Sequence, residues 1–175
     1  MIDIESGTAH FDVGLFAQSL GVPPDMVRER IDGRVMGLLV ELLARPILGG
    51  EFSSPGSQWD QTDGGGGRWE VRALTERGMD FSPSCARGAG RKFDADLFQV
   101  KLSLLAHGTG GGYLVFDVQL PGPALWQSVP PTSAPIDWWK LPAYGVRGWW
   151  TAGLLNSQAG LSRKAFLEMT DPENL

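Results

Sequence analysis

The chain has 175 residues, a length typical of a single domain, and its 42% hydrophobic content is sufficient for a buried core. Its 24 glycines and 12 prolines argue against a coiled coil, a helical bundle or a collagen-like chain, and they favour mixed helix and strand content with many turns. One cysteine and two histidines exclude an internal disulfide framework and the usual structural zinc sites, and a net charge of −5 argues against indiscriminate nucleic-acid binding.

Residues 9–47 are predicted to be helical. A first short helix is expected to end at Gly21 and the two prolines that soon follow it. Residues 36–43 are strongly apolar, and the helix that contains them is expected to stop at Pro46 or at the glycines after it. Glu41 lies within this apolar run, where it is either a solvated carboxylate or a carboxylate at the edge of a buried site.

A hairpin is predicted after this helical part. Residues 51–54 are expected to form a short strand, and the four-glycine run 64–67 is expected to form a hairpin tip. Residues 68–75 have the clearest strand pattern in the chain, because their side chains alternate between two faces. Glu70 and Arg72 therefore project side by side from one face of this strand.

Basic residues gather in the centre of the chain. Segment 68–101 has a net charge of +2, and the remainder of the chain has a net charge of −7. Residues 76–91 are irregular, and glycines lie between their arginines, which lets backbone amides and side chains approach an anion together. This loop predicts contacts of Arg87, Arg91 and Lys92 with DNA phosphates, and the alternative is an ordinary exposed loop.

Residues 92–106 are predicted to form an amphipathic helix. Lys101 lies at the edge of the apolar stripe of this helix. Its ammonium group either extends to solvent or reaches a site beneath the helix. The stripe consists of apolar residues at helical spacing, namely Phe93, Leu97, Val100 and Leu104, widened by Phe98 and Leu105.

The C-terminal part of the chain is rich in proline and tryptophan. Residues 113–120 are predicted to form a second strong strand, and residues 121–135 a proline-rich loop. The pairs Trp138–Trp139 and Trp149–Trp150 are expected on a strand, a turn and a strand, where they either pack in the core or form a surface for a partner or for stacked bases. Residues 162–169 are predicted to form a short terminal helix.

Acidic residues close to Glu70 suggest a metal site. A hairpin can place Asp60 or Asp63 beside Glu70 on the next strand. Two such carboxylates repel one another unless a cation neutralises them, and hard oxygen ligands suit Mg²⁺. Arg72, on the same strand face, can then contact a phosphate, which is an arrangement suited to phosphodiester hydrolysis.

The sequence from the apolar helix to the second strong strand resembles the PD-(D/E)XK nuclease superfamily, which has the restriction-endonuclease-like fold. The resemblance covers about residues 36–120. It rests on Asp60 or Asp63, on Glu70-Val71-Arg72, and on the order helix, hairpin, acidic strand, helix and strand. It implies an α/β fold with a central mixed β-sheet flanked by helices, a dependence on Mg²⁺ or Mn²⁺, and cleavage of DNA.

The resemblance also implies roles for individual residues. The metal-binding aspartate of the family corresponds to Asp63 or Asp60, and the second acidic ligand corresponds to Glu70. Arg72 occupies the position of the catalytic lysine, and because an arginine remains protonated it is a poor proton acceptor. Lys101 is a candidate to take over this role if its side chain points inward. Glu41 matches an extra carboxylate that some members place on the first helix.

These observations predict a Mg²⁺-dependent DNA endonuclease, with a restriction enzyme as one form of it. The chain is expected to be one domain, residues 1–175, with a helical part (1–47), a catalytic-type core (48–120) and a Pro/Trp-rich part (121–175). Two alternatives stay open: a non-catalytic DNA- or protein-binding module on the same fold, and an unrelated α/β protein that binds a small molecule. Both a homodimer and a partner subunit are compatible with the sequence. No apolar run approaches 18 residues and the first residues contain no apolar signal, so we expect a cytoplasmic protein without a membrane span.

Overall fold

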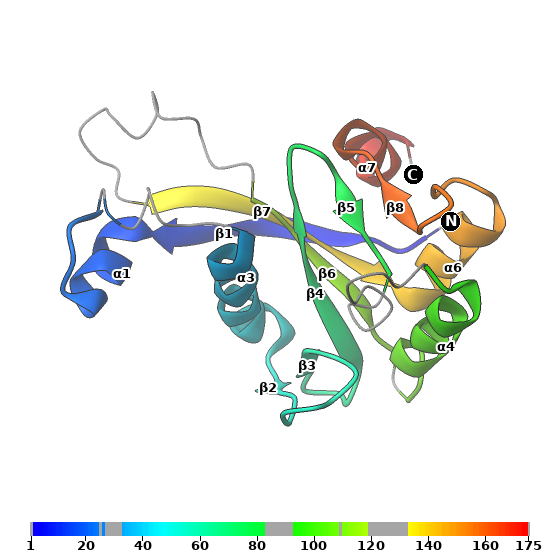
Figure 1. The fold of residues 1–175 in the computed structure, drawn as a ribbon, viewed down its shortest axis with the longest axis horizontal. Helices are drawn as coiled ribbons and strands as arrows, with labels where there is room; N and C mark the ends of the chain where they lie inside the picture. The colour runs from blue at the N-terminus through cyan, green and yellow to red at the C-terminus, as the bar shows by residue number, and fades with distance from the viewer. Residues whose placement is uncertain are drawn as a thin grey trace.

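The computed structural model describes residues 2–24, 26, 33–82, 93–108, 110–118 and 133–174. Within these ranges, helices and strands alternate along the chain in an α/β arrangement (Figure 1). The elements are β1 (Glu5–Asp12), α1 (Val13–Leu20), α3 (Gly33–Leu48), β2 (Glu51–Phe52), β3 (Gln61–Thr62), β4 (Arg68–Leu74), β5 (Met79–Asp80), α4 (Ala95–Leu105), β6 (Gly112–Asp117), β7 (Ser133–Pro142), α6 (Ala143–Thr151), β8 (Gly160–Leu161), α7 (Arg163–Thr170) and a 3-10 turn at Pro172–Asn174.

Six strands form one mixed, curled sheet with the order β1-β7-β6-β4-β3-β2. β2, β3 and β4 are antiparallel neighbours, whereas β4 and β6 are parallel. A parallel pair requires a crossover connection, and α4 lies in the segment that provides it. Strands are therefore present within the predicted ranges 51–54, 68–75 and 113–120, and the mixed α/β class is confirmed. β2 and β6 end earlier than predicted, at Phe52 and Asp117.

Helices cover both faces of this sheet. α1 and α3 pack on one face, against Leu114 and Phe116 of β6, and α4, α6 and α7 pack on the other, against Tyr113 and Val115. The side chains of β6 alternate between these two clusters and are completely buried. β4 and β6 thus form the centre of a three-layer structure, and the residues of β4 lie between the two helical layers.

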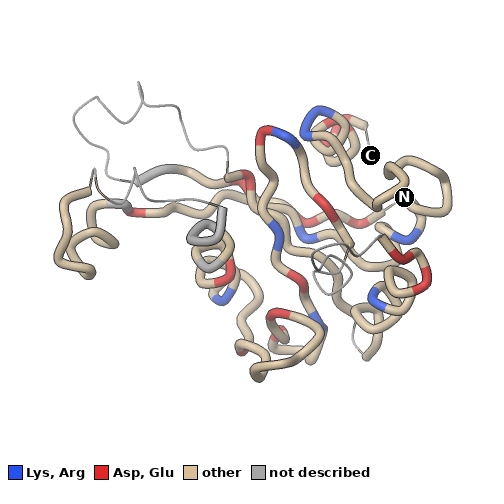
Figure 2. Tube along the Cα trace, viewed as in Figure 1, with Lys and Arg blue, Asp and Glu red and all other residues tan. Residues whose placement is uncertain are grey.

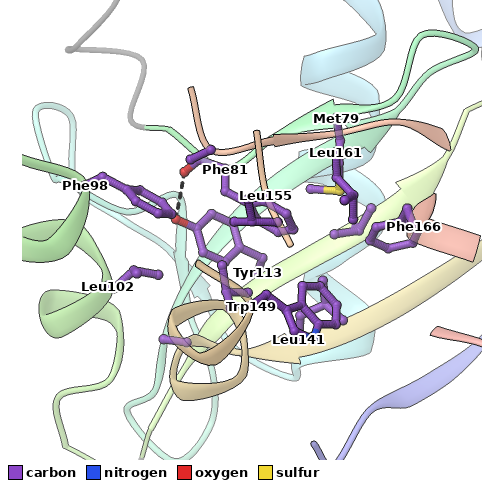
Figure 3. Close-up of a cluster of buried hydrophobic side chains, with 14 of the residues drawn as sticks. Met79, Phe81, Phe98, Leu102, Tyr113, Leu141, Trp149, Leu155, Leu161 and Phe166 are labelled. Carbon is purple, nitrogen blue, oxygen red and sulfur yellow. Dashed lines mark hydrogen bonds between the residues drawn. The ribbon is translucent and has the colours of Figure 1, made fainter. Parts of the chain in front are cut away.

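The larger hydrophobic cluster lies on the α4, α6 and α7 side (Figure 3). Phe81 and the ring of Tyr113 meet edge to face, with 5.0 Å between ring centroids. The Tyr113 hydroxyl donates a 2.8 Å hydrogen bond to the carbonyl oxygen of Phe81. Each fully buried large side chain in such a cluster contributes roughly 1.5–3 kcal/mol of transfer free energy. This packing holds α4 firmly against β4 and β6.

The prediction that residues 9–12 are helical is wrong. They belong to β1, which pairs with β7 along its whole length, from Glu5 opposite Lys140 to Asp12 opposite Ser133. Pairing with a strand so far away in the sequence outweighs the weak local preference of these residues. Helix α1 then begins at Val13, with the Asp12 carboxylate accepting a hydrogen bond from the Leu15 amide at its N-terminus.

The second predicted helix ends at the glycines and not at the proline. α3 continues through Pro46 to Leu48, and Gly49 follows in the left-handed conformation, with a φ of 63°. This is a common way for a helix to end, because glycine adopts positive φ without steric cost.

The strand expected at Trp149–Trp150 is also wrong, because these residues lie in helix α6. Trp149 and Val146, three residues apart, are buried on one face of α6, as helical spacing allows. Trp138–Trp139 lie on strand β7 as expected, and the terminal helix is confirmed as α7 with Ser162 as its N-cap.

Helix α4 lies within the predicted range 92–106, and Phe98 and Leu105 of the predicted stripe are buried, but the rest of the buried face differs. Leu97 and Val100, assigned to the buried stripe from the sequence, are 46% and 56% exposed. The buried positions are Phe98, Lys101, Leu102 and Leu105. Apolar residues on several sides of this helix allow more than one orientation, and packing against the sheet selects the one that turns Lys101 inward.

Candidate active site

Glu70 and Arg72 project from the same face of β4, as the strand alternation predicted. Arg72 donates a hydrogen bond from Nη2 to Glu70 Oε1, and its Nη1 donates to the Val71 carbonyl at 3.0 Å. Glu70 is only 4% exposed, so its charge is removed from bulk water. Figure 2 shows that acidic and basic positions follow one another along this strand. β4 therefore presents a carboxylate and a guanidinium in direct contact.

Asp60 lies immediately before β3 and faces the edge of β4. Its backbone amide donates to the Trp69 carbonyl at 3.0 Å, and its Oδ2 accepts a 2.8 Å hydrogen bond from the Val71 amide. Arg72 Nη1 lies 3.9 Å from the same Oδ2. The pKa of Asp60 is raised, first by burial and then by the nearby Glu70 carboxylate. Asp60 and Glu70 thus share one guanidinium.

The guanidinium of Arg72 is stabilised in its charged form by this arrangement. Burial alone lowers the pKa of Arg72, but the carboxylates of Glu70 and Asp60 raise it above its ordinary value. Arg72 therefore acts as a permanent cation that joins the two acidic side chains.

Lys101 enters the same cluster from α4. Its ammonium group forms an ion pair with Glu70 Oε2 and donates a hydrogen bond to the Gln58 carbonyl. Glu70 Oε2 accepts no hydrogen bond among the described residues, so the ion pair with Lys101 is its polar contact there. Lys101 is 8% exposed and reaches beneath the helix instead of extending to solvent. Glu70 is therefore held between cations from two elements.

Glu41 on α3 completes the acidic group. Burial raises its pKa, and the charges of Asp60 and Glu70 add to this effect. Gln61 Nε2 donates a hydrogen bond to the backbone carbonyl of Glu41, which ties α3 to β3 at this point. Glu41 is half-buried, and the charges of Asp60 and Glu70 act on it, which is compatible with a carboxylate at the edge of the site.

Asp63, in contrast, uses both of its carboxylate oxygens for hydrogen bonds within the hairpin. Its Oδ1 accepts hydrogen bonds from the Gly65 and Gly67 amides at 2.9 and 2.8 Å. Its Oδ2 accepts a 2.7 Å hydrogen bond from the Trp69 indole. The structure therefore brings Asp60, and not Asp63, into contact with the charged residues of β4.

The remaining predicted site residues, Arg87, Arg91 and Lys92, lie outside the described residues. The contributions of Gln58 and Gln61 were not anticipated from the sequence. Gln58 accepts the hydrogen bond of Lys101 with its backbone carbonyl, whereas the side-chain amide of Gln61 donates to the backbone carbonyl of Glu41. Because the acceptor in both contacts is a backbone carbonyl, no pair of residue types in the sequence signals them.

Within the described ranges, no group of three or more histidine, cysteine or acidic side chains is arranged to hold a metal ion. The site instead combines Asp60 and Glu70 with two cations, Arg72 and Lys101. With Glu41 at the edge, three acidic and two basic side chains leave a net negative charge. Such a site can accept a further cation, or it can bind a phosphate when that cation is present.

Comparisons with known proteins identify no relative. No protein-family model matches the chain, and neither the curated proteins nor the solved structures yield a significant match. In the described part of the chain, no helix combines the length and the apolar character required to cross a membrane. The function of the protein is therefore inferred from the geometry of the site.

Proposed function

We propose that this protein is a Mg²⁺-dependent endonuclease that hydrolyses phosphodiester bonds of DNA. The observation that carries the proposal is the convergence of Asp60 and Glu70 on the guanidinium of Arg72, with Lys101 paired to the other oxygen of Glu70. Catalytic sites commonly hold buried acidic and basic groups together in this way, which supports the proposal.

The order of the elements supports this proposal. Helix α3 is followed by the antiparallel strands β2, β3 and β4, and the chain then passes through α4 to β6, parallel to β4. The resemblance to PD-(D/E)XK nucleases rests on the same order of helix, hairpin, acidic strand, helix and strand. We accordingly propose a restriction-endonuclease-like core for this part of the chain.

The residues present fit a Mg²⁺ ion in their chemistry. Mg²⁺ is usually bound by one or two carboxylates together with waters and substrate phosphates, so Asp60 and Glu70 are a sufficient protein contribution. Glu70 Oε2 accepts no hydrogen bond among the described residues and has the Lys101 ammonium as its ion-pair partner. The pKa of Asp60 is raised first by burial and then by the Glu70 carboxylate, and a cation would offset the second contribution. When bound, the ion would polarise the phosphate and activate a water molecule.

The basic residues of the chain supply the remaining chemistry in this proposal. Arg72 carries a fixed positive charge and a fork of N–H donors, which suits the oxygens of a phosphate. Lys101, held by Gln58 and Glu70, is the residue that can orient or exchange a proton near the attacking water. Arg72 thus stabilises developing charge, and Lys101 takes the role of the family's lysine.

The proposal is tested by incubating supercoiled and linear DNA with the protein and Mg²⁺ or Mn²⁺, with EDTA as the metal-free reaction. We expect metal-dependent cleavage by the wild type and none by Glu70→Gln. Glu168→Gln is the matched control, because Glu168 is 61% exposed on α7 and pairs only loosely with Lys164 at 3.7 Å. Intact DNA in both metals, or equal cleavage by Glu70→Gln and Glu168→Gln, contradicts the proposal.

Metal binding has a readout that is independent of cleavage. An ion that binds the folded state stabilises it, by about 2.7 kcal/mol at a concentration 100 times its Kd. Mg²⁺ should therefore raise the Tm of the wild type and leave that of Asp60→Asn unchanged. Equal shifts for both proteins would remove Asp60 from the metal site.

A further inference from the structure

A cavity of about 440 Å³ adjoins the candidate active site on the side of Arg72. Arg72 and Ala73 of β4 form one wall of this cavity. The other wall is the turn between β4 and β5 together with β5 and the residues after it, where Arg77, Asp80 and Ser82 line the space. Because Arg72 also contacts Glu70 and Asp60, the cavity and the charged cluster share a residue.

The wall that carries Arg77 is well ordered by its backbone contacts. Thr75 and Gly78 exchange two backbone hydrogen bonds of 3.1 and 3.0 Å, and the Thr75 hydroxyl donates to the Gly78 carbonyl at 2.9 Å. Gly78 has a φ of 107°, and a Cβ there would lie 2.1 Å from the Leu161 carbonyl oxygen. Gly78, at the end of this turn, therefore lies against β8, which neighbours β5 in Figure 1, and the turn carries Arg77.

The charges of this cavity favour an anion. Arg77 is exposed, and nothing within the described part of the chain forms an ion pair or hydrogen bond with it. Asp80 carries the opposing charge, but its Oδ1 accepts hydrogen bonds from the Ser82 amide and hydroxyl at 2.8 and 2.7 Å. Among the described residues Arg77 is thus an unpaired guanidinium that lines the same cavity as Arg72, and it is suited to a phosphate group.

We propose that this cavity binds the nucleotide next to the bond that is cleaved, with its phosphate on Arg77. The space is open to solvent on one side, and its volume of about 440 Å³ exceeds the requirement of a bare phosphate and is sufficient for a small organic group. This inference rests on the proposed function, because the nucleotide is identified as a neighbour of the phosphate at Arg72. Arg77 is thereby a substrate-binding residue that is not among those implied by the resemblance to PD-(D/E)XK nucleases.

The test measures binding of a short double-stranded deoxyoligonucleotide by fluorescence anisotropy in EDTA, where the proposed reaction does not proceed. Loss of one phosphate contact lowers the slope of log K against log salt by about 0.9 and weakens binding at low salt. We expect this change for Arg77→Gln, with roughly tenfold weaker binding at low salt. Lys164→Gln, which removes a lysine that is 86% exposed on α7, should bind like the wild type.

Competition distinguishes a nucleotide site from a phosphate site. A deoxynucleoside 5′-monophosphate should displace the oligonucleotide from the wild type at lower concentration than inorganic phosphate, and this difference should disappear in Arg77→Gln. Equal competition by the two compounds would overturn the nucleotide assignment. Equal salt slopes for Arg77→Gln and Lys164→Gln would overturn the role of Arg77.

The same measurements separate this inference from the proposed reaction. Binding that depends on Arg77, without cleavage in any metal, leaves the site in place and contradicts the nuclease activity. If Arg77→Gln cleaves DNA with the same KM and salt dependence as the wild type, the nuclease activity is supported and the nucleotide site at Arg77 is contradicted. A wild-type protein that neither binds nor cleaves DNA contradicts both.

Discussion

Lys101 on α4 and Glu70 on β4 form an ion pair in which the two side chains are only 8% and 6% exposed. Removing either charge from water is unfavourable unless the other compensates for it. Glu70 is in addition hydrogen-bonded to Arg72, so a single carboxylate joins the helix to the strand. The orientation of α4 and the charge of the candidate site are thus determined by the same contact.

The first prediction concerns the stability of this pair. Lys101→Met leaves Glu70 buried with Arg72 as its remaining cation, and we expect a loss of about 2–3 kcal/mol in the free energy of unfolding. The double variant Lys101→Met/Glu70→Gln should recover part of this loss, because the uncompensated charge is gone. Urea unfolding of the two single variants and the double variant measures the coupling. Strictly additive effects would show that the two residues do not act as a pair.

The second prediction separates the two cations in catalysis. If Arg72 contacts phosphate as a positive charge, Arg72→Lys should keep part of the metal-dependent cleavage, and Arg72→Gln should lose about 10²-fold or more in rate. Single-turnover cleavage of a labelled duplex measures both. Equal rates for the two variants would show that the charge of Arg72 does not act on the phosphate, and that Lys101 or no cation at all has this role.

The third prediction follows from the raised pKa of Asp60. Ionising a carboxyl whose folded-state pKa is raised costs stability, and this cost develops as the pH rises from the ordinary value of 3.8 through the raised value. Asp60→Asn removes the charge, and an asparagine oxygen can still accept the hydrogen bond of the Val71 amide. The variant should therefore be at least as stable as the wild type at pH 7, and its advantage should shrink as the pH falls to 3.8.

Thermal unfolding across this pH range measures the effect, and cleavage by the same variant should be absent. Cleavage by the wild type should also fall in acid, because protonation of Asp60 competes with the metal ion. The opposite result would be a stability of Asp60→Asn, relative to the wild type, that is lower at pH 7 than at pH 4. It would refute the raised pKa of Asp60.

The fourth prediction concerns Asp63, for which we expect a loss of stability without a loss of metal binding. Its carboxylate accepts three hydrogen bonds, from the Gly65 and Gly67 amides and the Trp69 indole. Asp63→Ala should cost about 2–4 kcal/mol in unfolding free energy. At a temperature where the variant is still folded, cleavage and the Mg²⁺-induced shift in Tm should persist. Loss of metal binding in the folded variant would make Asp63 a ligand after all.

Some features of this protein follow from local sequence patterns. The alternation of residues 68–74 places Glu70 and Arg72 on one strand face, the glycine run 64–67 forms a turn, and Ser162 caps the last helix. Each of these depends on neighbours within a few residues, where geometry and steric preference dominate. The strand β1 could not be found in this way, because its hydrogen-bond partners lie in β7.

The residues of the candidate site were likewise determined in part by local sequence and in part by tertiary packing. The sequence alone determined that acidic residues of a hairpin lie near Glu70 and Arg72, because a short turn keeps them close. It did not distinguish Asp60 from Asp63, nor an inward from an outward Lys101. The tertiary structure decided both, because strand pairing directs the Asp60 carboxylate to the edge of β4, and core packing rotates α4 until Lys101 meets Glu70. Such decisions depend on the energy of packing whole elements together, which no short segment of the chain contains.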